Sequence, residues 1–88
     1  MAAPGIVVGR VVSQKGSCEA GMTVGQEFAF GDITPAGICS FLYHAAFPFA
    51  VALQYGATFP WEEDPDTATV ACPDAANPVV IELRRMRG

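Results

Sequence analysis

The sequence predicts a small α+β domain in which two strand pairs flank one apolar helix, in the order β-β-α-β-β. Three observations predict it. The 88 residues allow a single domain, 1–88, because two cores of half that length would approach the size of about 40 residues that requires disulfides or metals. Period-two alternation marks short segments near both ends, and helical periodicity marks the charge-free middle. An antiparallel sheet with the helix packed on one face is the economical arrangement, and a small curled barrel is the alternative.

The first two strands are predicted at 5–14 and 25–30. The first segment is dominated by β-branched residues, namely Ile6, Val7, Val8, Val11 and Val12. In the second, Phe28 and Phe30 alternate with Glu27 and Ala29, which indicates one buried face. The glycine-containing segment between them, 15–21, is expected to turn, so these two strands are predicted to pair.

A helix is predicted between Thr34, which can cap the first free amides ahead of Pro35, and a stop at Gly56. Spacing at about 100° per residue puts a core face on one side of this helix. The residues of that predicted core face are Ile38, Phe41, Leu42, Ala45, Phe49, Ala52 and Leu53. Pro48 removes one backbone hydrogen bond in the middle, so the apolar helix is expected to be kinked or split there.

The last two strands are predicted at 67–72 and 79–84. Ala68, Val70 and Cys72 share one side of the first of these segments. In the second, Val79, Ile81 and Leu83 alternate with polar and charged positions. Between the two strands, 73–78 consists of turn-forming residues, so the two strands are expected to be adjacent.

Composition predicts association with a second copy or another protein. Hydrophobic residues make up 51% of the chain and charged residues 16%, against about 25% charged in an average domain. A domain this small buries only about 60% of its unfolded surface, so one protomer cannot hide all its apolar residues. The helix face opposite the predicted core is strongly aromatic. We therefore predict an oligomer interface formed by Tyr43, His44, Phe47, Val51, Tyr55 and Trp61.

The net charge of −4 argues against nucleic acid and anionic membrane surfaces as partners. The first residues lack the basic and apolar regions of a signal peptide, and three widely spaced cysteines fit reduced thiols, so a cytoplasmic location is predicted. The charge-free stretch 33–61 contains Pro35, Gly37 and Pro48, which argue against a membrane-spanning helix. The acidic 62–66 segment and the C-terminal arginines carry opposite charges, which favours a contact between subunits.

The candidate ligand or metal site consists of Cys18, Cys39, Cys72, His44 and Asp74. Thiolate and imidazole ligands suit zinc, but none of these cysteines forms the close pair typical of structural zinc sites. Cys39 and His44 are separated by about 140° around a helix, so a nucleophilic Cys-His pair would have to join different elements. Cysteines that act only as small buried hydrophobes are the alternative interpretation.

Four motifs resemble an uncharacterised, automatically defined and numbered family of small prokaryotic proteins. They are Gly16-x-Cys18-x-x-Gly21-x-x-x-Gly25-x-x-Phe28, Thr34-Pro35-x-Gly37-x-Cys39, Pro60-Trp61-Glu62-x-Asp64-Pro65-Asp66 and Cys72-Pro73-Asp74 leading to Pro78-Val79. The resemblance implies a small stand-alone cytosolic protein of bacteria or archaea. It carries over no activity, catalytic residue or cofactor, but it places all three cysteines within the motifs.

The leading functional hypothesis is an oligomeric binding or accessory protein with a small-molecule pocket near the three cysteines. One alternative is an enzyme or metal-binding protein that uses the cysteines, His44 and Asp74 at a subunit boundary. Another is a structural subunit of a larger hetero-complex. The sequence identifies no catalytic residue and no cofactor.

Overall fold

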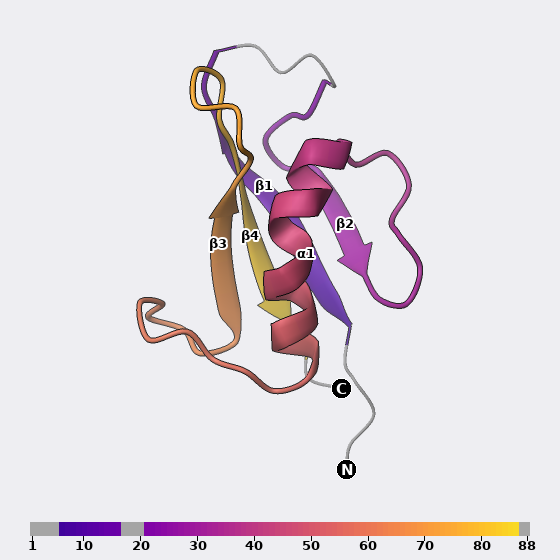
Figure 1. Cartoon of the computed structure of the whole chain (residues 1–88), viewed down its shortest axis with the longest axis vertical. Helices are drawn as coiled ribbons and strands as arrows, with labels where there is room; N and C mark the ends of the chain where they lie inside the picture. Colours follow the sequence, from indigo (N-terminus) through magenta and orange to yellow (C-terminus); the bar gives the residue numbers. More distant parts are fainter. Residues whose placement is uncertain (1–5, 17–20, 87–88) are drawn as a thin grey trace.

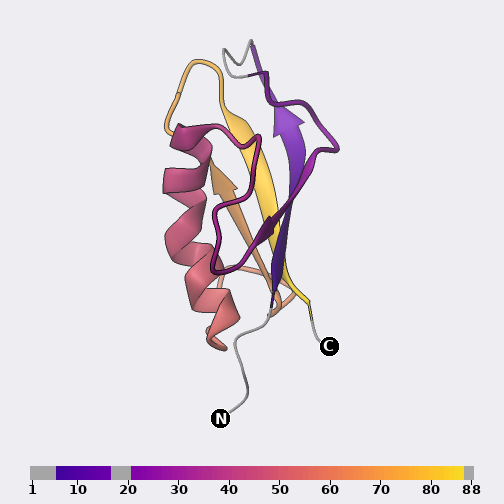
Figure 2. The ribbon, with the colours of Figure 1, turned by 90° about the vertical axis from the view of Figure 1, so that its right-hand side faces the viewer.

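The computed structural model describes residues 6–16 and 21–86, which form a two-layer α+β fold. The elements are β1 (Val7–Gln14), β2 (Glu27–Phe30), α1 (Ser40–Gln54), β3 (Thr67–Ala71) and β4 (Val79–Arg85). The antiparallel sheet has the order β2-β1-β4-β3, and α1 lies across one of its faces (Figures 1 and 2). The predicted fold class is confirmed. The sheet is open, with β2 and β3 at its edges, and is not a curled barrel.

β1 and β4 are the two interior strands, and their pairing joins the two predicted strand pairs. Gly9 is paired with Phe28 of β2 on one side and with Leu83 of β4 on the other. The register of β1 against β4 shifts between Val11 and Ser13, which is a β-bulge. Both predicted pairings, β1 with β2 and β3 with β4, are present.

Alternation along the strands separates a core face from an outer face, as the sequence predicts. The core-facing apolar side chains of the sheet, all less than 10% exposed, are Val7, Val11, Phe28, Phe30, Ala68, Val70, Val79, Ile81 and Leu83. Gly9 is the small residue among them. A Cβ atom there would lie 2.7 Å from Ile81 Cδ1 and 2.8 Å from Phe30 Cε2, so neighbouring side chains already fill that space.

The predicted helix start at Thr34 is wrong, because α1 begins at Ser40 with Cys39 as its N-cap residue. Residues 36–37 form a turn, and Gly37 has a φ of +83°, a left-handed conformation that interrupts a helix. The predicted stop is confirmed, because α1 ends just before Gly56, whose φ is +94°. Pro48 lies inside α1, which continues past it to Gln54.

The buried stripe of α1 differs from the predicted core face. Its fully buried residues are Leu42, Ala46, Ala50 and Leu53, and their mean direction is rotated by about 75° around the helix from the predicted one. Phe41, a member of the predicted core face, is 71% exposed. The physical reason is space: the two alanines lie against a sheet already filled by branched and aromatic side chains, and larger residues are displaced to the flanks.

The acidic 62–66 segment and the arginines of β4 form bonds within the chain, so these bonds need no contact between subunits. Asp64 accepts a 2.8 Å hydrogen bond from Arg84, and Asp66 accepts bonds of 3.0 and 3.2 Å from Arg85. The Asp66 backbone N–H and the Arg84 guanidinium hold the pKa of Asp64 below its ordinary value. The hydrogen bond to Asp64 raises the pKa of Arg84.

Candidate functional site

The most distinctive surface of the described structure is the side of α1 that faces away from the sheet. We define the α1 outer face as Ser40, Phe41, His44, Phe47, Pro48, Val51 and Tyr55. These residues fall within about 60° of one direction around the helix, opposite the buried stripe. Phe41 and Tyr55 are 71% and 69% exposed. The face is about 22 Å long at 1.5 Å per residue, and it contains no charged side chain.

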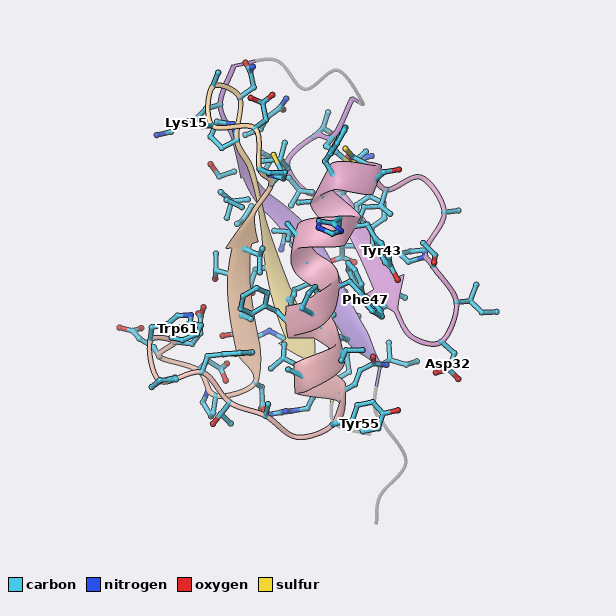
Figure 3. All side chains as sticks on the ribbon, in the orientation of Figure 1. Lys15, Asp32, Tyr43, Phe47, Tyr55 and Trp61 are labelled. Atoms are coloured by element: carbon cyan, nitrogen blue, oxygen red, sulfur yellow. The ribbon has the colours of Figure 1, made fainter. Side chains whose placement is uncertain are left out.

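Aromatic rings in contact with one another continue this surface on both sides of the helix. On one side Tyr43 lies parallel to Phe30, with ring centroids 5.7 Å apart, and contacts Phe47 at 5.3 Å. On the other side a row of tilted rings, Phe49 to Phe59 to Trp61, has centroid separations of 5.4 and 5.2 Å. Tyr43 and Trp61 lie on opposite sides of α1 (Figure 3). Aromatic side chains held by such ring contacts lose little conformational entropy when they are buried.

Charged residues are concentrated on the opposite face of the sheet. In the strand register Arg10 lies between Glu27 of β2 and Glu82 of β4, which gives a row of alternating charge. Arg84 occupies the same outer face of β4. In a two-layer domain the outward side of the helix ordinarily carries such groups. Here the outer face of the sheet carries these charged groups, and the outward side of the helix carries none.

Four of the six interface residues predicted from the sequence are exposed, and the other two, Tyr43 and Val51, are half-buried. Those that are exposed are His44, Phe47, Tyr55 and Trp61. Phe41 is the exposed aromatic residue of α1 that the sequence prediction missed, because the periodicity placed it on the predicted core face. The spacing of Leu42, Ala46, Ala50 and Leu53 contains the signal that would have found the correct side, because it aligns small residues for close approach to the sheet.

Cys72 and Asp74, two of the predicted ligands, stabilise the turn between β3 and β4. The Cys72 Sγ accepts a 3.2 Å hydrogen bond from the Val79 backbone N–H and lies 4.0 Å from the Asn77 carbonyl oxygen. The Asp74 Oδ1 accepts 3.2 Å bonds from the backbone N–H groups of Ala76 and Asn77. Both residues therefore have a structural role in forming this turn.

The other predicted ligands lie on different parts of the fold. Cys39 occupies the N-cap position of α1 without a capping hydrogen bond from its side chain, His44 belongs to the α1 outer face, and Cys18 lies outside the described residues. Within 6–16 and 21–86, no three His, Cys, Asp or Glu side chains lie close enough together to hold a metal ion. A metal site, a pocket or a catalytic pair that includes Cys18 stays a prediction.

Comparison of the chain with protein-family models, curated proteins and solved structures gave no match in any of the three. The resemblance to a numbered family therefore stays a prediction. In the described part of the chain, no helix has both the length and the apolar character needed to cross a bilayer.

Proposed function

We propose that this chain is a non-catalytic binding protein that forms homo-oligomers through the α1 outer face. A single observation carries the proposal: the helix exposes a charge-free aromatic surface, whereas the alternating charges of Arg10, Glu27 and Glu82 lie on the outer face of the sheet. A second copy fits this surface because it offers the same apolar residues. A partner with a strongly charged surface would find no opposite charge there.

The exposed aromatic residues offer enough apolar area for reversible association. Phe41, Phe47 and Tyr55 are 71%, 39% and 69% exposed. Their burial would remove on the order of 300 Å² per protomer from water, worth about 7 kcal/mol at about 25 cal/mol per Å². Two protomers together gain about twice that figure, which is of the same order as the roughly 4–15 kcal/mol cost of association. We therefore expect association that depends on protein concentration.

Light scattering coupled to size exclusion, from low micromolar to near-millimolar protein, tests the proposal. We expect the average mass to rise above that of one chain as concentration increases. Phe41→Glu should weaken association at least tenfold, because it would bury an unpaired charge at the interface. The matched control is Val24→Glu: this residue is 61% exposed, and the 21–26 segment projects on the side of the sheet away from α1 (Figure 2).

Two results would contradict the proposal. The first is a wild-type chain that remains strictly monomeric at the highest concentration. The second is Phe41→Glu protein that remains folded by circular dichroism and associates as strongly as the Val24→Glu control. In either case another surface, or none, would be responsible for association.

A further inference from the structure

We infer that Glu62 closes the outer edge of β3 against pairing with the β3 edge of a second copy. Its carboxylate acts as a competing acceptor for a backbone N–H that a neighbouring strand would otherwise use. The β3 edge is therefore an interaction surface that opens when this acceptor is lost. It is separate from the α1 outer face, and its closure does not depend on association through that face.

β3 is an edge strand whose sequence suits pairing with a further strand. It pairs with β4 on one side only, and Thr67–Ala71 contains two threonines, one valine and no charged residue. β-branched residues favour extended strands, and an uncharged edge is a template for another strand. Proteins that contain such an edge usually have a feature that prevents this pairing.

The hydrogen bonds between β3 and β4 show which backbone groups of β3 point to the open side. The Cys72 N–H, directly after β3, donates to the Val79 carbonyl oxygen of β4 at 2.8 Å. Successive N–H groups of a strand point to opposite sides. The N–H groups of Thr67, Thr69 and Ala71 therefore point away from β4, where an added strand would accept them.

Glu62 occupies the middle one of these three donors. Its Oε2 accepts a 2.9 Å hydrogen bond from the Thr69 N–H, and its Oε1 accepts a 3.5 Å bond from the Thr69 hydroxyl group. The 57–66 segment that carries Glu62 lies beside the start of β3, on the side away from β4 (Figure 1). An approaching strand would have to displace both the carboxylate and this segment.

The donors on either side of Thr69 differ from each other. The Thr67 N–H donates to the Asp64 carbonyl oxygen at 3.1 Å, and the Asp64 side chain is bonded to Arg84. The Ala71 N–H, by contrast, has no backbone acceptor within the described residues. Loss of the Glu62 bond would therefore leave two successive edge donors, those of Thr69 and Ala71, available to another strand.

Two opened edges fit each other around a two-fold axis. When Val70 lies opposite the partner's Val70, Thr69 lies opposite the partner's Ala71 and Ala71 lies opposite the partner's Thr69. Each of these two pairs exchanges both of its N–H···O bonds in an antiparallel ladder. The Asp64 turn keeps its own bond to Thr67, and the two sheets join into one.

Association of neighbouring charge-loss variants tests the role of the Glu62 bond. In the Phe41→Glu background, which weakens association through the α1 outer face, Glu62→Ala should strengthen association at least tenfold in light scattering. This change is equivalent to about 1.4 kcal/mol, and both copies lose a hydrogen bond to a charged group. Glu63→Ala is the matched control and should leave association unchanged. Glu63 is exposed, so this variant removes the same charge and keeps the bond to Thr69.

Hydrogen exchange at the Ala71 amide, measured by NMR, identifies the surface that associates. In Glu62→Ala protein this exchange should slow as the protein concentration rises, because pairing gives the Ala71 N–H an acceptor. In Glu63→Ala protein it should not depend on concentration. The Ala71 amide reports on the β3 edge whether or not the α1 outer face associates, so failure of this inference and failure of the proposed function are distinguishable.

Three results would overturn the inference. The first is Glu62→Ala protein that is folded by circular dichroism and associates no more strongly than the Glu63→Ala control. The second is stronger association with no change at the Ala71 amide, which would place the contact elsewhere. The third comes from Glu62→Gln, whose amide oxygen can still accept the Thr69 N–H and should keep the edge closed. If this variant associates as strongly as Glu62→Ala, the hydrogen bond is not what closes the edge.

Discussion

Arg85 joins three parts of the fold, and its truncation provides a sharp test of the structure. Its Nη1 donates to the carbonyl oxygens of Leu53 and Ala57, at 2.7 and 3.0 Å, at the C-terminal end of α1. Its Nε and Nη2 donate to Asp66 Oδ1, and Nη2 also donates to the Pro65 carbonyl oxygen. The last turn of α1 contains no basic residue, so Arg85 supplies from β4 the positive charge that a helix C-terminus favours.

The expected cost of Arg85→Ala follows from the burial of these groups. The Arg85 and Asp66 side chains are only 11% and 22% exposed. Removal of one partner of such a pair costs about 3–5 kcal/mol, and the partial access of water favours the lower limit. An 88-residue domain has a total stability of roughly 4–13 kcal/mol. We therefore expect a loss of about 3 kcal/mol, equivalent to a fall in Tm of about 12–24 °C.

Urea unfolding at one fixed protein concentration, followed by circular dichroism and by Trp61 fluorescence, measures this loss. Arg84→Ala is the matched control, because Arg84 directly precedes Arg85 in β4 and makes a comparable 2.8 Å ion pair with Asp64. The control pair is exposed, at 46% and 42%, so its loss should cost about 0–1 kcal/mol. Arg85→Lys should fall between the two, because an ammonium group cannot reproduce the planar fork of donors.

One result would refute this reasoning. If folded Arg85→Ala protein is no less stable than Arg84→Ala protein, then the bonds from Arg85 to α1 and to the 62–66 segment add nothing to stability. The structural role assigned to the acidic segment would then be wrong.

Three further predictions concern the edge strand, the charge network and the core. Glu62→Ala should accelerate hydrogen exchange at the Thr69 amide, measured by NMR, because Glu62 Oε2 accepts a 2.9 Å hydrogen bond from the Thr69 N–H on the outer edge of β3. Unchanged exchange at Thr69 would contradict this. The stabilisation from Asp64 should be present above the ordinary pKa of its carboxyl group and should be lost as the pH falls through the lowered pKa of the folded protein. NMR titration should show that Arg84→Ala raises the pKa of Asp64 only in part, because the hydrogen bond from the Asp66 N–H remains. A pKa of Asp64 that does not move would oppose the assignment. Gly9→Ala should cost about 1–3 kcal/mol in urea unfolding through overpacking, and a neutral substitution would show that the core can yield there.

Much of the fold could be predicted from the sequence because strand periodicity is a local property. The alternation of Phe28 and Phe30 with their neighbours, and of Ile81 and Leu83 with theirs, identifies strands without knowledge of what they contact. The order of elements and the short turn-forming segment 73–78 then restrict the topology to adjacent antiparallel pairs. The stop of α1 at Gly56 was predictable for the same reason, since a left-handed residue ends a helix locally.

The helix start and the candidate site were less predictable because they depend on tertiary contacts. Thr34 followed by Pro35 is a sound local start signal, yet Gly37 takes a left-handed conformation and α1 begins only at Ser40. Cys72 and Asp74 have residue types that suit a ligand site, but the Asn77 to Val79 segment engages both of them in a turn. Residue type shows what a side chain can bind, whereas distance decides what it does bind.

By itself the sequence determined the strands, their pairing and a charge-free helix too apolar for one small protomer to hide. Only the tertiary structure decided which side of that helix faces outward and where the acidic segment finds its partners. The physical reason is that periodicity fixes the angles between residues on a helix but not the helix rotation against a sheet. That rotation depends on the space left by the sheet, which accepts Ala46 and Ala50 and displaces Phe41 to the surface.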